Sequence, residues 1–160
     1  MLLSLVLPAA CGESGDDPAP SGGHPGQPET PGGNESGDPG ETSLKIGITV
    51  GSRTITATME DNAAGRDFLS RLPLEITLND YNGTTEKIFY PDPALTTEGV
   101  TRGCAPTPGD ITIYAPWGNV AIFCKNWSHS SDLIKIGRID GDGIDALSIG
   151  GDIRVKIERQ

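Results

Sequence analysis

The polar loop from Ser128 to Asp132 holds the residue types of a hydrolytic triad, and His129 is the single histidine of residues 43–160. The members of such triads come together from distant parts of a fold rather than from adjacent positions. The sequence has no Gly-x-Ser-x-Gly elbow that would present a nucleophile. We therefore interpret His129 as ordinary loop polarity. A lone histidine also argues against a histidine-based metal site.

A second polar cluster, from Asp140 to Asp145, has acids at the short spacing of a calcium loop. An EF-hand needs oxygen ligands at its first, third and fifth positions, glycine at the sixth and glutamate at the twelfth. Ile144, Asp145 and Gly151 occupy the fifth, sixth and twelfth positions here. We interpret the cluster as a turn rich in Asp and Gly, and we expect neither a metal nor another cofactor.

Cys104 and Cys124 are the two cysteines of residues 43–160. An even pair is compatible with a disulfide if the protein is exported. Hairpin pairing would set Cys124 opposite about Ile111, with Cys104 within the reach of a loop. Two free thiols are the alternative. Neither a C-x-x-C spacing nor a neighbouring histidine is present, so neither thiol is predicted to be catalytic.

Both tryptophans of the chain lie in one stretch, Pro108–Ile139. Two β-rich runs in it, 110–115 and 120–125, flank the turn Pro-Trp-Gly-Asn. A large apolar side chain in a turn, such as Trp117, either packs back onto the core or meets a ligand. We predict an aromatic groove for a ligand beside this turn. The candidate groove residues are Tyr114, Trp117, Phe123, Trp127 and His129.

Residues 1–11 resemble a truncated bacterial lipoprotein signal, in which small residues precede a cysteine that becomes lipid-modified. Met1–Ala10 is apolar but too short to span a bilayer, which needs about 20 residues. Ala9 and Ala10 directly precede Cys11, and no basic region precedes the apolar run. We predict lipidation at Cys11. The protein would then be extracytoplasmic and would reach the bacterial cell membrane through this lipid alone.

Residues 12–42 contain no Val, Ile, Leu, Met or aromatic residue, and are rich in Gly, Pro, Ser and acids. This composition cannot bury enough apolar surface to fold, so it predicts a disordered tether. A flexible tether of this length reaches about 30 Å. The chain has a net charge of −10, and every Lys and Arg lies after residue 42. The nearly balanced body lacks the clustered Lys and Arg that phosphate contacts need, which excludes nucleic acid as a partner.

Residues 43–160 are predicted to form one domain, which we expect to be monomeric. A helix is predicted over 60–73, with Asp61 as its N-cap and Pro73 at its end, and a helical turn over 144–147. Alternation predicts strands over 44–50, 54–59, 74–78, 86–90, 110–115, 120–125, 133–139 and 152–158. This pattern predicts a mainly β fold, a closed antiparallel barrel of about eight strands with one or two short helices. The side chains expected to fill it include Ile111, Ile113, Val120 and Ile122, with Trp117 and the Trp127–His129 loop at its ends.

The order of these elements resembles that of a cyclophilin. GSRTITATMEDNAAGRDFLSRLP is similar to the cyclophilin opening, and PGDITIYAPWGNVAIFC to the strand pair that lines the active groove. GDITIYAPWGN, IFCKN and LIKIGRI resemble more closely the bacterial cyclophilin-like fold proteins. Some of those are lipoproteins and some are joined to a flavodoxin, although no segment here itself indicates flavin binding. The resemblance covers about residues 44–158 and implies a cyclophilin-like barrel.

Prolyl isomerisation in cyclophilins depends on an arginine in a Phe-His-Arg-Ile-Ile-Pro strand. The corresponding residues, 85–91, read TEKIFYP and hold Lys87 but no Arg or His. Lysine lacks the planar fork of a guanidinium, so the exchange is not conservative. The resemblance therefore implies a binding module without isomerase activity, for a peptide, protein or small ligand. The alternative is an extracytoplasmic peptidyl-prolyl isomerase that helps folding, with Lys87 or Arg102 replacing the arginine; both join the groove candidates.

Overall fold

The computed structural model describes residues 43–160, and the predicted signal (1–11), lipidation at Cys11 and tether (12–42) lie outside these residues. The described part is a closed, eight-stranded antiparallel barrel with a single α-helix, as the sequence predicts. The elements are β1 (Lys45–Val50), β2 (Arg53–Met59), α1 (Ala63–Ser70), β3 (Leu74–Tyr81), β4 (Glu86–Phe89), β5 (Asp110–Tyr114), β6 (Asn119–Phe123), β7 (Leu133–Ile139), the 3-10 helix η1 (Gly143–Ala146) and β8 (Ile153–Arg159). Around the barrel the strands follow the order β1-β2-β7-β5-β6-β4-β3-β8.

The ends of two elements differ from the sequence prediction. Strand β3 extends to Tyr81 because it pairs with β8 in its first half and with β4 in its second. The N-cap of α1 is Asn62, whose side-chain Oδ1 accepts a hydrogen bond from the N–H of Gly65 at 2.8 Å. The predicted cap, Asp61, lies one residue earlier and pairs with Arg66. No helix in residues 43–160 is long and apolar enough to cross a membrane.

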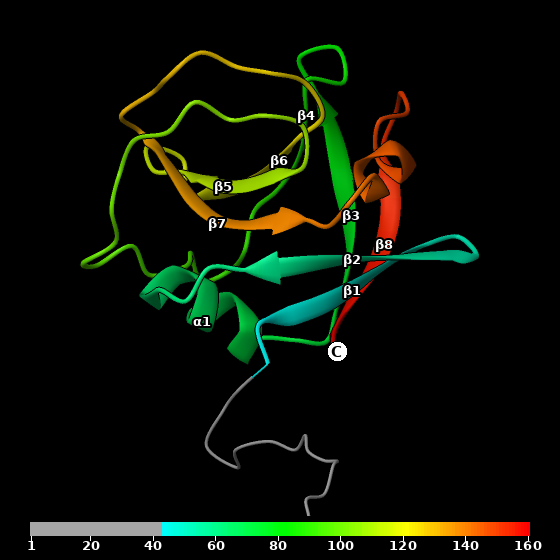
Figure 1. Ribbon diagram of the computed structural model, residues 1–160, viewed down its shortest axis with the longest axis horizontal. Helices are drawn as coiled ribbons and strands as arrows, with labels where there is room; N and C mark the ends of the chain where they lie inside the picture. The colour runs from blue at the N-terminus through cyan, green and yellow to red at the C-terminus, as the bar shows by residue number, and fades with distance from the viewer. Residues whose placement is uncertain (1–42) are drawn as a thin grey trace, which may run out of the picture. The chain divides into compact units, whose positions relative to one another are not determined.

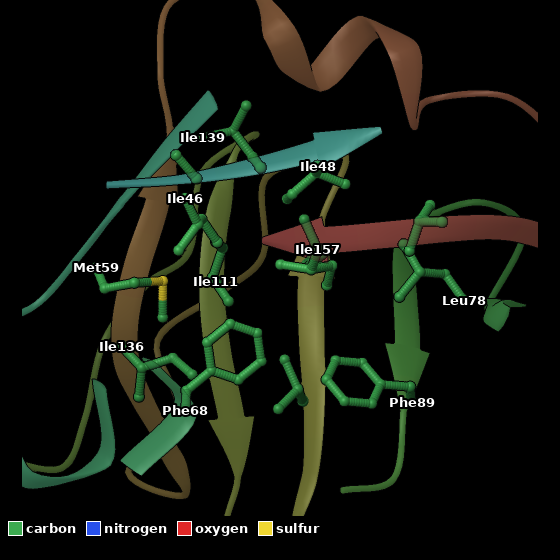
Figure 2. Packing of buried hydrophobic residues seen from close by; sticks show 14 of the residues in the cluster. Ile46, Ile48, Met59, Phe68, Leu78, Phe89, Ile111, Ile136, Ile139 and Ile157 are labelled. Carbon is green, nitrogen blue, oxygen red and sulfur yellow. The ribbon is translucent and has the colours of Figure 1, made fainter. Parts of the chain in front are cut away.

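The barrel interior is filled by one apolar cluster, to which every strand contributes. Successive side chains of a strand point to opposite faces, so every second residue enters the interior. The prediction for Ile111, Ile113, Val120 and Ile122 is confirmed, since all four are buried in this cluster. Figure 2 shows the side chains from opposite walls pointing toward one another, Ile111 and Ile157 among them.

The two open ends of the barrel are closed by different segments. At one end α1 lies beneath β2 (Figure 1), and its Phe68 ring packs against Phe89, with 6.3 Å between the ring centroids. The residues of η1 contact β2, and Ile144 and Leu147 join the interior cluster. The chain that follows η1 covers the region where β4 begins, because carbonyls of residues 149 and 151 accept hydrogen bonds from Lys87.

Candidate functional site

A second apolar cluster lies on the outer face of the wall formed by β4, β6, β5 and β7. It consists of Ile88, Ala121, Phe123 and Leu133, and Tyr114 and Cys104 pack against it. Strand β6 contributes to both faces, because Val120 and Ile122 point inward while Ala121 and Phe123 point outward. All four of these side chains are buried, so this part of the outer wall is already covered by the segments that pack over it.

Above this cluster lies a pocket with a volume of about 350 Å³. The structure brings four of the predicted groove residues together in its lining: Tyr114, Trp117, Phe123 and Trp127. The other lining residues are Tyr81, Glu86, Ile88, Asn119, Ser130 and Leu133. Trp117 and Trp127 lie along the barrel's outer wall, and this corrects the expectation that they lie at its ends.

The position of Trp117 follows from the tight connection between β5 and β6. The N–H groups of Trp117 and Gly118 both donate to the carbonyl of Tyr114, at 3.2 and 2.8 Å. Gly118 has φ +72°, a conformation that costs glycine little and other residues more. The turn folds the indole back over the wall, where it meets the rings of Tyr114 and Tyr81 edge-on at centroid distances of 5.3 and 6.1 Å.

Two loops outside β5 and β6 position Trp127. The N–H of Trp127 donates to the carbonyl of Pro106 at 3.0 Å, and Cys104 and Ser130 exchange two backbone hydrogen bonds. Figure 1 shows both loops on the same side of the barrel. Asp110 anchors the first loop, because its carboxylate accepts a hydrogen bond from the N–H of Thr107 at 2.9 Å. The indole is therefore fixed at the pocket by backbone pairing.

Glu86 is the carboxylate of the pocket. It stands between Tyr81 on β3 and Phe123 on β6 in the strand register. Burial raises the pKa of its carboxyl above the ordinary value of 4.5. In residues 43–160 no Lys, Arg or His forms an ion pair with it. The pocket thus contains a partly desolvated negative charge without a counter-ion from the described residues.

Replacing Glu86 with glutamine is expected to stabilise the protein at neutral pH. Because folding raises the pKa of Glu86, its protonated carboxyl stabilises the folded state, and this stabilisation is fully present below pH 4.5. The stabilisation is lost as the pH rises through the pKa that Glu86 has in the folded protein. Urea unfolding should show Glu86→Gln as the more stable protein at pH 7, with the difference shrinking toward pH 4. Glu75→Gln, an exposed change on β3, should show no such gain. A destabilised Glu86→Gln at pH 7 would contradict the assigned burial effect.

Asn119 places an unsatisfied amide in the same pocket. Its side chain is 2% exposed, and its Oδ1 has no hydrogen-bond partner in residues 43–160. Most buried polar atoms in folded proteins are hydrogen-bonded, and each exception needs an explanation. Asn119 Oδ1 is thus a buried acceptor without a partner among the described residues, on a side chain that lines the pocket.

A family model described as "Cyclophilin-like family" matches residues 48–158. This is most of the chain, and it includes all or part of each of the eight strands. The chain belongs to the cyclophilin-like family. The solution structure of the hypothetical protein AF2241 from Archaeoglobus fulgidus is similar, with a TM-score of 0.55 and 19% sequence identity. The similarity covers 76% of this chain and 99% of that one, and at this identity it shows the fold alone. A search of curated proteins finds no match.

Lys87 lies on the other face of the wall from the pocket of this cyclophilin-like barrel. It pairs with Ile122 across β4 and β6, and both side chains point inward. Lys87 is 0% exposed, and its Nζ donates to the carbonyls of Ile149 at 2.5 Å and Gly151 at 2.6 Å. Its Nζ also lies 3.4 Å from Asp80 Oδ1. This corrects its assignment as a groove residue, because strand alternation presents Glu86 and Ile88 to the pocket instead.

Asp80 and Lys87 together hold the loop after η1 against the barrel. The hydrogen bonds from the N–H of Gly151 and from Thr84, together with the charge of Lys87, outweigh desolvation and lower the pKa of the Asp80 carboxyl. All of these contacts join Asp80 and Lys87 to other residues of the domain. The pair is therefore structural.

Two further groove candidates, Arg102 and His129, are exposed and do not line the pocket. His129 lies beside Gly103: a Cβ added to Gly103 would come within 3.2 Å of Nε2 of His129. Among residues 43–160 no group of three or more His, Cys, Asp or Glu side chains is placed to hold a metal ion. Asp140, from the acidic cluster, accepts hydrogen bonds from Lys45, Thr56 and Thr58. These bonds link the end of β7 to β1 and β2.

The structure also corrects the disulfide alternative, since Cys104 and Cys124 are both free thiols. Cys124 packs against the interior cluster and Cys104 against the outer one, so the wall of the barrel separates them. The hairpin register pairs Ile111 with Ile122, which moves Cys124 beyond the end of β6. Burial raises the pKa of both thiols, so neither is an activated nucleophile at neutral pH.

Sequence reasoning missed Tyr81, Glu86 and Asn119. Alternation along β4 groups Glu86 with Ile88 and Lys87 with Phe89, but Ile88 and Phe89 are both apolar, so the sequence does not show which pair faces outward. Lys87 is the cation that stands at the position of the cyclophilin arginine, but its side chain faces the interior. Tyr81 belongs to the part of β3 that the sequence prediction left out.

Proposed function

We propose that this cyclophilin-like domain is a non-catalytic binding module whose outer-wall pocket holds a small ligand. The observation that carries the proposal is the pair of tryptophans, which are 52% and 44% exposed while lining one pocket. The pocket volume of about 350 Å³ falls in the range of small-molecule sites. Exposing two large rings without a partner would be unfavourable, and a ligand that covers them removes this cost.

The pocket lacks the group on which cyclophilin catalysis depends. That reaction needs a hydrogen-bond donor directed at the substrate proline, supplied by arginine. In this chain the corresponding strand presents Glu86, which is an acceptor with the opposite charge. Lys87 is committed to carbonyls inside the barrel, and Arg102 is outside the pocket lining. These placements support binding without isomerisation.

A fluorescence screen tests the binding proposal, because Trp117 and Trp127 are the only tryptophans of the whole chain. The full chain is titrated with small cationic, neutral and anionic compounds while the emission spectrum is recorded. At least one class is expected to change the emission saturably, and Trp117→Ala should move the saturation to a higher ligand concentration while Trp127 still reports binding. Failure of every class to do so would contradict a small-ligand module.

No prolyl isomerase activity is expected. A protease-coupled assay with a proline-containing peptide should give the uncatalysed rate at protein concentrations where a cyclophilin gives a strong signal. Catalysis above background that disappears in Arg102→Ala, in a protein that remains folded, would establish the isomerase alternative instead. Lys87 variants are unsuitable for this purpose because Lys87 supports the fold.

We also propose that the domain is extracytoplasmic and lipid-anchored at Cys11. The support is the sequence alone: small residues precede Cys11, and residues 12–42 contain no large apolar residue. The full chain expressed in a bacterium should sediment with the membrane fraction, and Cys11→Ser should move it to the soluble fraction. Cys104→Ser serves as the matched control and should leave the distribution unchanged. Retention of Cys11→Ser in the membrane would refute the anchor.

A further inference from the structure

We propose that the outer-wall pocket selects organic ammonium ions, with Glu86 as the residue that confers this preference. The proposal rests on the proposed function, since it names the ligand class of the same pocket. Three independent features of the lining support it: its charge, the arrangement of its aromatic rings and its unsatisfied acceptor.

The charge of the pocket is negative. Glu86 is the only acidic or basic residue among the ten that line it. The two basic residues of β7, Lys135 and Arg138, are already paired, since both contact Asp110, at 3.2 and 2.6 Å. An anionic ligand would be repelled by Glu86, and a neutral one would leave its partly buried charge uncompensated. A cation is the ligand that removes this imbalance.

Aromatic side chains make up much of the pocket lining, and such a lining suits a cation. The indole of Trp117 is perpendicular to the rings of Tyr81 and Tyr114, with interplanar angles of 89° and 87°. Sites that bind quaternary ammonium groups are built from several aromatic rings packed close together. Phe123 and Trp127 complete the lining, so five of its ten residues are aromatic. Five rings with one carboxylate favour an alkylated cation over a strongly hydrated metal ion.

The unsatisfied Oδ1 of Asn119 adds a second requirement. Asn119 and Phe123 are the ends of β6, and Glu86 pairs with Phe123. Phe123 lies four positions after Asn119 on the strand, which is about 13 Å along the wall. Only a ligand about that long contacts both residues, so a short ammonium ion such as choline tests the position near Glu86 alone.

Choline and 3,3-dimethyl-1-butanol form the decisive pair of probes, because they have nearly the same shape and differ in charge. The full chain is titrated with each, and with tetramethylammonium and butylammonium, at constant ionic strength maintained with sodium chloride. Tryptophan emission reports binding. At least one of the cations is expected to bind, and choline should bind at least about tenfold more tightly than its neutral counterpart.

Glu86→Gln isolates the charge. It should lower the affinity for choline at least about tenfold and leave that for 3,3-dimethyl-1-butanol unchanged, so that the preference disappears. Glu75→Gln removes an exposed carboxylate from the neighbouring strand and should keep the preference. Circular dichroism and thermal melting confirm that both variants are folded. A preference that survives in folded Glu86→Gln would overturn the role assigned to this residue.

The result also separates this inference from the proposed function. If neutral or anionic compounds change the emission saturably and no ammonium ion does, the pocket is a binding site and the selectivity is wrong. Equal affinity for choline and 3,3-dimethyl-1-butanol would likewise show that the pocket binds ligands but does not select cations. If no compound of any class changes the emission, both the proposed function and its ligand class are wrong.

Discussion

Lys87→Ala is expected to destabilise the domain by about 3–4 kcal/mol, the largest effect of any single change considered. The variant loses two short hydrogen bonds from a charged donor, to the carbonyls of Ile149 and Gly151. It also leaves a cavity where a fully buried side chain fills the barrel beside Ile122. Equilibrium unfolding in urea, followed by circular dichroism, measures the difference.

Two further variants separate the causes of this effect. Lys87→Met keeps most of the buried volume and removes only the donor, so it should be destabilised by about half as much. Lys125→Ala removes an exposed lysine whose Nζ donates to the carbonyl of Gly83, and should change stability by less than about 0.5 kcal/mol. If Lys87→Ala is as stable as the wild type, Lys87 is not the structural residue that its contacts indicate, and a role in the groove becomes possible again.

Trp117→Ala is expected to weaken ligand binding by about 2 kcal/mol, roughly 30-fold in Kd. The indole forms one wall of the pocket and packs edge-on against Tyr81 and Tyr114, so its loss opens the pocket and releases both phenol rings. Stability should fall by less than about 1 kcal/mol, because half of the side chain is exposed. The remaining Trp127 reports binding by its fluorescence.

Tyr90→Ala is the matched control for this change. Tyr90 directly follows β4, is 58% exposed and does not line the pocket. Its removal should leave the affinity within a factor of about two, which is the range of surface substitutions away from a binding site. Comparable losses in Trp117→Ala and Tyr90→Ala would indicate that ligands bind to exposed aromatic surface in general rather than to the pocket.

The barrel could be predicted from the sequence because its signal is local. Alternation along each strand identifies the residues that face the core, and Ile111, Ile113, Val120 and Ile122 are where this pattern places them. The eight strands were found within a few residues of their observed ends. The sequence prediction ends β3 at residue 78, whereas the strand continues to Tyr81. Its last three residues are held by pairing with β4, and local alternation does not reveal such pairing.

The pocket could be predicted only in part, because it depends on which face of the wall each residue occupies. The aromatic residues near the Trp117 turn stood out by type, and four of them line the pocket. Glu86 and Lys87 are neighbours on one strand, and only the closed barrel decides which of the two is outside. The same dependence explains Cys104 and Cys124, which look like a pair in the sequence and lie on opposite faces.

The most direct test of the outer-wall pocket as the binding site is a ¹H–¹⁵N correlation spectrum recorded while choline is added to the ¹⁵N-labelled full chain. The chain has two tryptophans, so its two indole N–H signals both report on the pocket. We predict that both signals and the amides of Glu86, Ile88 and Asn119 shift saturably, while those of the β1–β2 hairpin stay in place. Shifts centred away from these residues, or no saturable shift at all, would contradict the account.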